Sequence, residues 1–252
     1  MSNLERHNDE IHENAVAWER KPTLQRCYKQ FHELIASHLS RLPQGKVVEL
    51  GSGIGNIKET IPECIRTDLF ENPWLDQIEN AYALSFEDGS VADLILFDVF
   101  HHLRHPGFAL QEFARVLKPG GRVHIFEPRI SLLGRLVYGT CHPEPIGWRD
   151  PIEWEAPRDW SPGQIDYYAA QGNATRLFVL GQDMDQWSGW RLVTCEQRSA
   201  LAYVLSGGYS KPQLYPTAAY PLIKRLEQCA DWLPAVFATR LLVVLEKASS
   251  EA

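Results

Sequence analysis

Three glycines at alternate positions follow directly on a short apolar run, and this feature constrains the fold more than any other. Lys46–Leu50 (KVVEL) has the composition of a buried strand, and Gly51, Gly53 and Gly55 come next. A backbone that passes close to a ligand at the carboxyl end of a strand needs glycine, because a Cβ there would collide with the ligand or with the turn. A generic turn between a strand and a helix can also hold two glycines, but three at alternate positions favour a ligand site.

This strand and turn open a regular alternation of strands and helices over residues 45–127. Residues 91–98 (VADLILFD) are almost entirely apolar, as a central parallel strand covered on both faces is. Short loops separate the segments, so we expect an α/β fold with a Rossmann-like, doubly wound, mostly parallel sheet. Seven strands are predicted, at residues 46–50, 64–68, 78–81, 91–98, 122–127, 190–199 and 241–247. Helices are predicted at residues 56–61, 73–77, 106–117 and 217–229.

Two further segments flank this core alternation. Residues 15–42 carry apolar side chains every three or four positions, which predicts a helix, and we expect residues 1–44 to form a helical segment that covers the site. The main domain is then residues 45–252. After the fifth predicted strand, residues 129–180 are rich in Trp, Tyr and Pro and show no sustained period. We expect them to form an aromatic-rich insertion that caps the sheet on the substrate side.

Composition excludes several classes of protein. The 252 residues allow one large domain with an insertion, and a net charge of -7 without a basic stripe disfavours nucleic acid as a partner. The five cysteines include no C-x-x-C pair, which fits reduced thiols in the cytoplasm, and no Cys or His pair has the spacing of a zinc site, so no metal is expected. The polar N-terminus is unlike a signal peptide, and no apolar stretch reaches the ~20 residues of an integral membrane segment. No residue pattern predicts an oligomeric state.

The glycine turn and the acid that follows it indicate the kind of ligand. A dinucleotide fingerprint has a glycine at the sixth position from Gly51, where this chain has Asn56, so the turn favours another adenosyl ligand over NAD. Asp68 ends the second predicted strand, near the position at which an acid accepts hydrogen bonds from a ribose diol. The alternative for Asp68 is a solvated side chain that caps the following turn.

Taken in order, five motifs resemble those of class I S-adenosylmethionine-dependent methyltransferases, most closely the type 11 methyltransferase domain. They are VVELGSGIG at 47–55, Asp68, NAYALSFEDG at 80–89, DLILFDVFHHL at 93–103 and RVLKPGGR at 115–122. The resemblance covers residues 45–127, about a third of the chain, and it is specific as an ordered set.

The resemblance implies S-adenosylmethionine as the cofactor and assigns roles by position. The glycines would lie under its methionine and ribose portions, Glu49 would help to hold the methionine amino group, and Asp68 would grip the ribose hydroxyls. Asn80 stands where the adenine-binding Asp usually is, and an Asn oxygen can still accept from the adenine amino group. The complete implied set is Glu49, Gly51, Ser52, Gly53, Gly55, Asp68, Leu69, Asn80, Ala81, Asp98 and Val99.

Candidate catalytic residues follow from the chemistry. A sulfonium methyl is already electrophilic, so the enzyme mainly aligns the acceptor and excludes water, and a hydroxyl acceptor also needs a base. His101 follows the fourth predicted strand at the expected mouth of the site, beside His102, and His142 lies in the insertion with Glu144 close enough to orient it. The alternatives are a His pair that packs the loop and a solvated loop His.

The sequence therefore predicts methyl transfer to a small-molecule acceptor, and the apolar residues 130–138 suggest an apolar or acyl-like one, although they also suit the core of the cap. A cofactor-binding but inactive regulatory or scaffold protein is the alternative. A nicotinamide-dependent oxidoreductase is disfavoured by Asn56.

Overall fold

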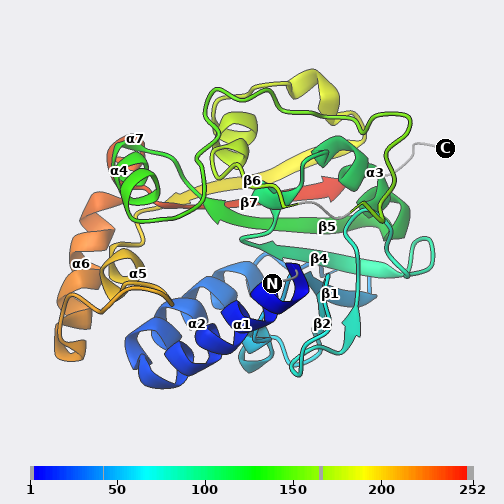
Figure 1. Ribbon diagram of the computed structural model, residues 1–252. Coiled ribbons are helices and arrows are strands. Elements are labelled where there is room, and N and C mark those ends of the chain that lie inside the picture. The colour runs from blue at the N-terminus through cyan, green and yellow to red at the C-terminus, as the bar shows by residue number, and fades with distance from the viewer. Residues whose placement is uncertain (1–2, 42, 165–166, 249–252) are drawn as a thin grey trace.

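The chain folds around one seven-stranded sheet in the order β3-β2-β1-β4-β5-β7-β6. The computed structural model describes residues 3–41, 43–164 and 167–248. Neighbouring strands are parallel except that β7 runs antiparallel to both β5 and β6, so the predicted mostly parallel Rossmann-like sheet is confirmed (Figure 1). The strands are β1 (Lys46–Leu50), β2 (Ile65–Asp68), β3 (Gln77–Ile78), β4 (Val91–Phe97), β5 (Leu117–Pro128), β6 (Trp190–Arg198) and β7 (Arg240–Lys247).

Helices cover both faces of this sheet (Figure 1). The α-helices are α1 (Asn3–Arg20), α2 (Pro22–Ala36), α3 (Pro106–Val116), α4 (Leu132–Thr140), α5 (Leu201–Ser206), α6 (Tyr220–Ala230) and α7 (Pro234–Phe237). Short turns of other helix types are η1 (Asn56–Glu59), η2 (Phe100–His102), η3 (Thr175–Val179), η4 (Met184–Trp187) and η5 (Thr217–Ala219). No helix in the described ranges is long and apolar enough to cross a membrane.

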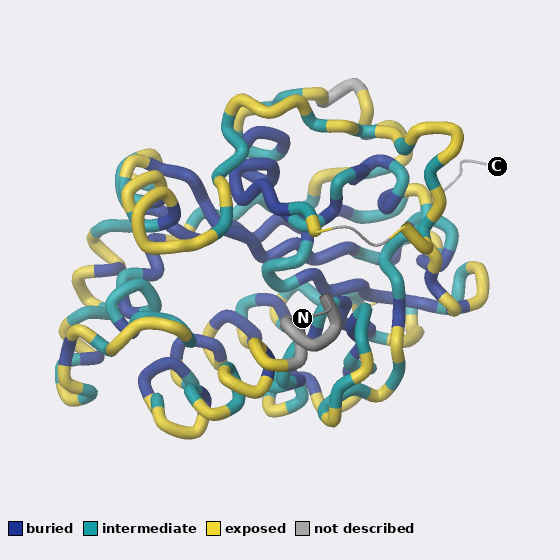
Figure 2. The backbone as a smooth tube through the Cα atoms, viewed as in Figure 1, coloured by how far each residue is buried: buried dark blue, intermediate teal, exposed yellow. Residues whose placement is uncertain are grey.

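The hydrophobic core has two parts because alternate strand residues point to opposite faces of the sheet. Leu94 and Leu96 of β4 pack on one face with α3 and with the insertion, whereas Ile95 packs on the other face with α2 and α5. Both parts consist of buried residues, and in Figure 2 the central strands β4, β5 and β7 are mainly buried. Packing on both faces of the sheet holds the carboxyl ends of β1, β2, β4 and β5 in fixed positions.

Local structure differs from the sequence predictions at three places. The predicted helix over 15–42 is divided into α1 and α2 at Lys21, because Pro22 cannot continue the helix that precedes it. Residues 73–76 form a turn, not the predicted helix, and the strand predicted at 78–81 is the two-residue β3, Gln77–Ile78, because Asn80 and Ala81 already belong to the turn that follows it. Strand β5 begins at Leu117 and includes the Pro-Gly-Gly segment that was expected to precede it.

The insertion after β5 contains α4, η3 and long irregular stretches between them. Residues 165–166 of the predicted insertion, and residues 1, 2 and 42 of the predicted N-terminal segment, lie outside the described residues. Trp18 of α1 packs with Tyr28 of α2, and Ile54 of the glycine turn packs against the same cluster. In the insertion, the Ala170 amide donates to the His101 carbonyl over 3.0 Å. The N-terminal helices and the insertion therefore both lie near the carboxyl ends of the parallel strands.

Candidate active site

The glycine turn after β1 adopts a backbone that side chains disfavour. Gly51, Gly53 and Gly55 have φ values of +70°, +51° and +67°. A Cβ on Gly51 would lie 2.4 Å from Cγ2 of Val99, and one on Gly55 would lie 2.7 Å from Cδ of Arg66. A Cβ on Gly53 would meet nothing within 4 Å. Packing therefore requires glycine at the outer two positions, whereas Gly53 faces open space at the carboxyl end of β1.

Hydrogen bonds hold Asp68 against this turn. The amide of Gly53 donates to Oδ2 of Asp68 over 3.1 Å, and the amide of Leu69 donates to its Oδ1 over 2.7 Å. Ser52 strengthens the connection, because its amide donates to the Thr67 carbonyl over 2.8 Å and its hydroxyl oxygen accepts from the Thr67 amide. The carboxylate, only 6% exposed, is thus positioned by backbone donors rather than solvated.

Glu49 is a buried carboxylate with an unused oxygen. The residue is 3% exposed, and its Oε2 has no hydrogen-bond partner among the described residues. Burial raises the pKa of Glu49 to about 7, and the nearby charge of Asp68 raises the pKa further, against a hydrogen bond from Ser52 that lowers it. An unpaired buried carboxylate oxygen is destabilising unless a ligand supplies a donor or a positive charge.

The side chain of Asn80 connects the loop after β3 to the insertion through hydrogen bonds. Its Oδ1 accepts a hydrogen bond from the Tyr82 amide over 3.0 Å, and its Nδ2 donates to the Pro162 carbonyl over 2.7 Å. The side chain therefore has a structural role, and the second lone pair of Oδ1 is what it can offer to an adenine amino group. Ala81 follows it, partly buried against the core.

At the end of β4, Asp98 adopts an unusual backbone and pairs with a buried arginine. Its φ is +56°, in the left-handed region, and its Oδ2 accepts from Arg240 over 2.8 Å. Arg240, 1% exposed, is surrounded by aromatic rings whose centres lie 4.6–5.8 Å from its guanidinium. The rings belong to Phe31, Phe97, Phe126 and Tyr203. Oδ1 of Asp98 is buried without a partner among the described residues.

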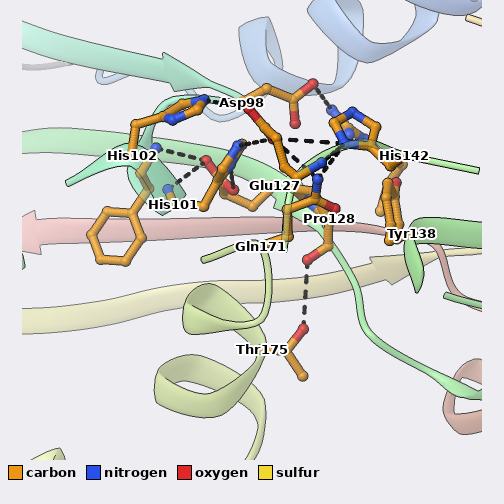
Figure 3. Close-up of polar contacts among 12 residues, drawn as sticks. Asp98, His101, His102, Glu127, Pro128, Tyr138, His142, Gln171 and Thr175 are labelled. Atoms are coloured by element: carbon orange, nitrogen blue, oxygen red, sulfur yellow. Dashed lines mark hydrogen bonds and ion pairs between the residues drawn. The ribbon is translucent and has the colours of Figure 1, made fainter. Parts of the chain in front are cut away.

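His101 lies between two carboxylates, as Figure 3 shows for its contact with Glu127. Nδ1 of His101 is 2.6 Å from Oε2 of Glu127, and its Nε2 is 3.3 Å from Oε2 of Glu144. Glu127 is completely buried at the end of β5, and its Oε1 also accepts from the Phe100 amide over 2.7 Å. Burial lowers the pKa of His101, but the charges and hydrogen bonds of Glu127 and Glu144 outweigh burial and raise the pKa to about 10.

Glu144 of the insertion is the centre of the remaining polar contacts. Its Oε1 accepts from the Tyr167 hydroxyl over 2.8 Å and lies 3.5 Å from Nε2 of His102. Its Oε2 lies 3.0 Å from Nε2 of Gln171 and 3.7 Å from Nδ1 of His142. Hydrogen bonds from His101 and Tyr167 and the charges of the histidines lower the pKa of Glu144 in spite of its burial, and burial lowers the pKa of His142.

The residues around the glycine turn and the histidine–carboxylate cluster of His101, His102, Glu127, His142 and Glu144 lie next to each other. Val99 contacts Gly51, as the clash of a Cβ there with Val99 shows, and Asp98 lies beside His101 and Glu127, with ligand atoms of all three within 4.8 Å. The structure therefore brings the two candidate catalytic histidines, His101 and His142, to one cluster at the carboxyl ends of β4 and β5, next to the glycine turn.

Four residues of this cluster were not among the sequence candidates: Glu127, Tyr167, Gln171 and Arg240. An acid at the end of RVHIFE, where an apolar strand ends, is a sequence signal for Glu127. A charged residue at the start of the apolar run RLLVV is a weaker one for Arg240. Gln171 carries no local signal, because only the folding of the insertion brings it to His142, 2.6 Å away.

Comparisons with known proteins give the kind of domain and the fold. Residues 49–125 match the family model of the methyltransferase domain. No curated protein sequence matches the chain. A SAM-dependent methyltransferase from Thermotoga maritima shares 14% identity over 95% of this chain and 99% of that chain, with a TM-score of 0.51. One from Archaeoglobus fulgidus shares 15% identity over 88% and 94%, also with a TM-score of 0.51.

A third solved structure, geranyl diphosphate C-methyltransferase from Streptomyces coelicolor A3(2), contains Mg²⁺, geranyl diphosphate and S-adenosyl-L-homocysteine. It shares 12% identity over 87% of this chain and 77% of that chain, with a TM-score of 0.50. At such identities the likeness establishes a shared fold. Residues 49–125 therefore match a methyltransferase domain, and the seven-stranded sheet around them shares its fold with these solved methyltransferases.

Proposed function

We propose that the protein transfers a methyl group from S-adenosylmethionine to a small-molecule acceptor whose reacting atom enters at the carboxyl ends of β4 and β5. The observation that carries this proposal is the contact between two sites. The His101–Glu144 cluster directly adjoins the glycine turn through Asp98 and Val99. An acceptor bound at the cluster can thus lie in line with a methyl group held above the turn.

Three features of the chain fit the cofactor. Gly53 leaves open space where a ligand can approach the backbone, and Asp68 lies directly beside it with a carboxylate suited to ribose hydroxyls. The buried, unpartnered Oε2 of Glu49 suits the positively charged amino group of the methionine portion. Ser52, Gly51 and Gly55 would shape the turn, and Leu69, Asn80, Ala81, Asp98 and Val99 would complete the walls.

When bound, S-adenosylmethionine supplies an electrophilic methyl group, so the protein has to orient the acceptor and exclude water. The packing of Ile54 against the cluster of Trp18, Leu24 and Tyr28 supports a covering role for residues 1–44 over the glycine turn. The insertion supports a second cover, since residues 142–171 provide Glu144, Tyr167 and Gln171 to the cluster.

Among the candidate catalytic residues, we assign His142 to contact with the acceptor and His101 to positioning. The side chain of His142 is 43% exposed, so an acceptor can reach it, and Glu144 and Gln171 hold it through Nδ1. His101 is buried, with a side-chain exposure of 4%, and acts through Glu144. Nδ1 of His142 accepts from the side-chain amide of Gln171 and from the backbone amide of Glu144, so it carries the lone pair of the neutral ring. For an acceptor that must lose a proton, Nδ1 would take that proton in place of these hydrogen bonds.

The exposed leucines of α4 support an apolar or acyl-like body for the acceptor. Leu132 and Leu136 are 65% and 61% exposed on the helix that leads directly to His142. An apolar chain lying on α4 would present its polar end to the histidine cluster.

The proposal is tested in two steps with the full chain. Calorimetry should show binding of S-adenosylmethionine and S-adenosylhomocysteine with Kd values in roughly the micromolar range, near typical cofactor levels. Incubation with S-adenosylmethionine and a metabolite extract should then yield a product heavier by one methyl unit in mass spectrometry. His142→Asn should remove product formation without changing the Kd for S-adenosylhomocysteine.

Absence of any binding heat would refute both the cofactor and the reaction. Binding without a methylated product from extracts of any source, and equal cellular function of the wild type and His142→Asn, would identify a regulatory or scaffold protein instead. Binding of NADH in a fluorescence titration would refute the choice of cofactor.

A further inference from the structure

The cluster at Glu144 has a property that methyl transfer by itself does not require. We infer that His101, His102 and Glu144 form a binding site for a divalent transition-metal ion of the zinc class. The ligand atoms of these three residues all lie within 4.8 Å of one another, and they come from η2 and from the insertion. Two imidazoles and one carboxylate are a ligand set that zinc and related ions use with one or more open positions.

The orientation of both histidines supports this inference. Nδ1 of His102 donates to the Tyr168 carbonyl over 2.8 Å, and Nδ1 of His101 donates to Glu127 over 2.6 Å. A carbonyl oxygen can only accept, so Nδ1 of His102 carries a proton, and in the neutral ring a lone pair on Nε2 faces the Glu144 carboxylate. Two acceptors that face each other need a positive charge between them, which an ion can supply. On binding, the ion would replace the Nε2 proton that His101 otherwise donates to Glu144.

The distances favour a metal ion over a shared proton. Nε2 of His101 and Nε2 of His102 lie 3.3 and 3.5 Å from the two oxygens of Glu144. Charge-assisted hydrogen bonds between such groups are shorter, at roughly 2.7–2.9 Å. Neighbouring ligand atoms of a zinc ion with bonds of about 2.0–2.2 Å lie roughly 3.3–3.5 Å apart. Each histidine faces a different oxygen of Glu144 at such a distance, which agrees with an ion that this carboxylate binds through both oxygens.

The surroundings resemble the outer shell of a metal centre. A ligating histidine commonly donates its other N–H to a carboxylate or a backbone carbonyl, and Glu127 and the Tyr168 carbonyl have these two roles here. Gln171 adds an independent observation, because it is 1% exposed, contacts Glu144, and its Oε1 has no partner among the described residues. This buried amide oxygen offers a further ligand to an ion beside Glu144.

The sequence did not indicate this site, because the spacing typical of zinc sites is absent from the cysteines and histidines. His101 and His102 are adjacent in the chain, and the third ligand comes from Glu144 of the insertion. If the proposed function holds, an ion here would polarise an acceptor oxygen next to His142. The metal site itself is independent of that function, since the ligands are present without the cofactor.

Direct titration tests the inference with the full, chelator-treated chain, free of a histidine tag. Zn²⁺ titrated in a calorimeter should bind at one site per chain, and Co²⁺ should give the visible absorption bands of a low-symmetry site with nitrogen ligands. Glu144→Gln and, as a second variant, His102→Ala should each weaken Zn²⁺ binding at least about tenfold. Binding of S-adenosylhomocysteine to both variants reports that they are folded.

Glu153→Gln is the matched control, because Glu153 is a half-exposed carboxylate 3.8 Å from Nδ1 of another histidine, His105. It should bind Zn²⁺ as the wild type does. Equal Zn²⁺ affinity of Glu144→Gln and the wild type would overturn the inference, as would the absence of Co²⁺ bands or tight binding of Mg²⁺ without Zn²⁺. Zn²⁺ binding in a chain that fails to bind S-adenosylmethionine would leave the metal site standing and refute only the proposed function.

Discussion

Replacing Gly53 with alanine should separate cofactor binding from stability. The backbone at Gly53 has φ +51°, and an added Cβ meets no protein atom within 4 Å. The substitution therefore introduces left-handed strain but no clash, which destabilises the chain by about 1–2 kcal/mol. In a chain of this length, each kcal/mol lowers Tm by roughly 2–4 °C.

The same methyl group would occupy the space in which the cofactor approaches the backbone. We expect the Kd for S-adenosylhomocysteine, measured by calorimetry, to rise at least about tenfold, or about 1.4 kcal/mol. Gly51→Ala should instead destabilise the fold further, because its Cβ would lie 2.4 Å from Val99.

Gly89→Ala is the matched control for Gly53→Ala. Gly89 has φ +60° and also has open space around its added Cβ, but it lies before β4, at the amino end of that strand. Its loss of Tm should equal that of Gly53→Ala, and its Kd should equal that of the wild type. Equal Kd values for the two variants, after equal losses of Tm, would show that the cofactor does not lie over Gly53.

Two further perturbations test the buried charges. The folded pKa of Glu49, about 7, lies above the ordinary value of 4.5, so Glu49 stabilises the fold fully below pH 4.5 and this contribution is lost as pH rises through 7. In urea titrations, Glu49→Gln should therefore have the same free energy of unfolding as the wild type near pH 4 and a free energy of unfolding about 3 kcal/mol higher at pH 8. The variant should also bind the cofactor more weakly. Equal free energies of unfolding at pH 8 would contradict this prediction. Arg240→Met should lower the free energy of unfolding by about 1.5–3 kcal/mol, because it leaves the partly exposed Asp98 without its buried partner, and Asp98→Asn in the same chain should recover part of the loss. A urea titration that shows a loss under about 1 kcal/mol for Arg240→Met would contradict the role of this pair.

The N-terminal half of the site is the part that sequence patterns predicted best. The strand that ends at Leu50, the glycines after it and the acid that ends β2 are all local features, because each depends on a few neighbouring residues. Predictions failed where a local pattern was ambiguous. The apolar repeat over 15–42 continues through Pro22, but the missing N–H of proline divides the helix, and residues 73–77 are too short a segment for periodicity to separate a helix from a turn.

The class of fold, the glycine turn and the acid after β2 can be predicted from short segments, because strand composition, glycine spacing and chain order are local properties. The histidine cluster and the Asp98–Arg240 pair instead arise from tertiary packing. Their members are separated by 43 and 142 positions in the chain, and they meet because β4, β5 and β7 are neighbours in the sheet and the insertion folds back over their ends. Contacts of that range depend on how whole elements pack, and no local pattern encodes the packing.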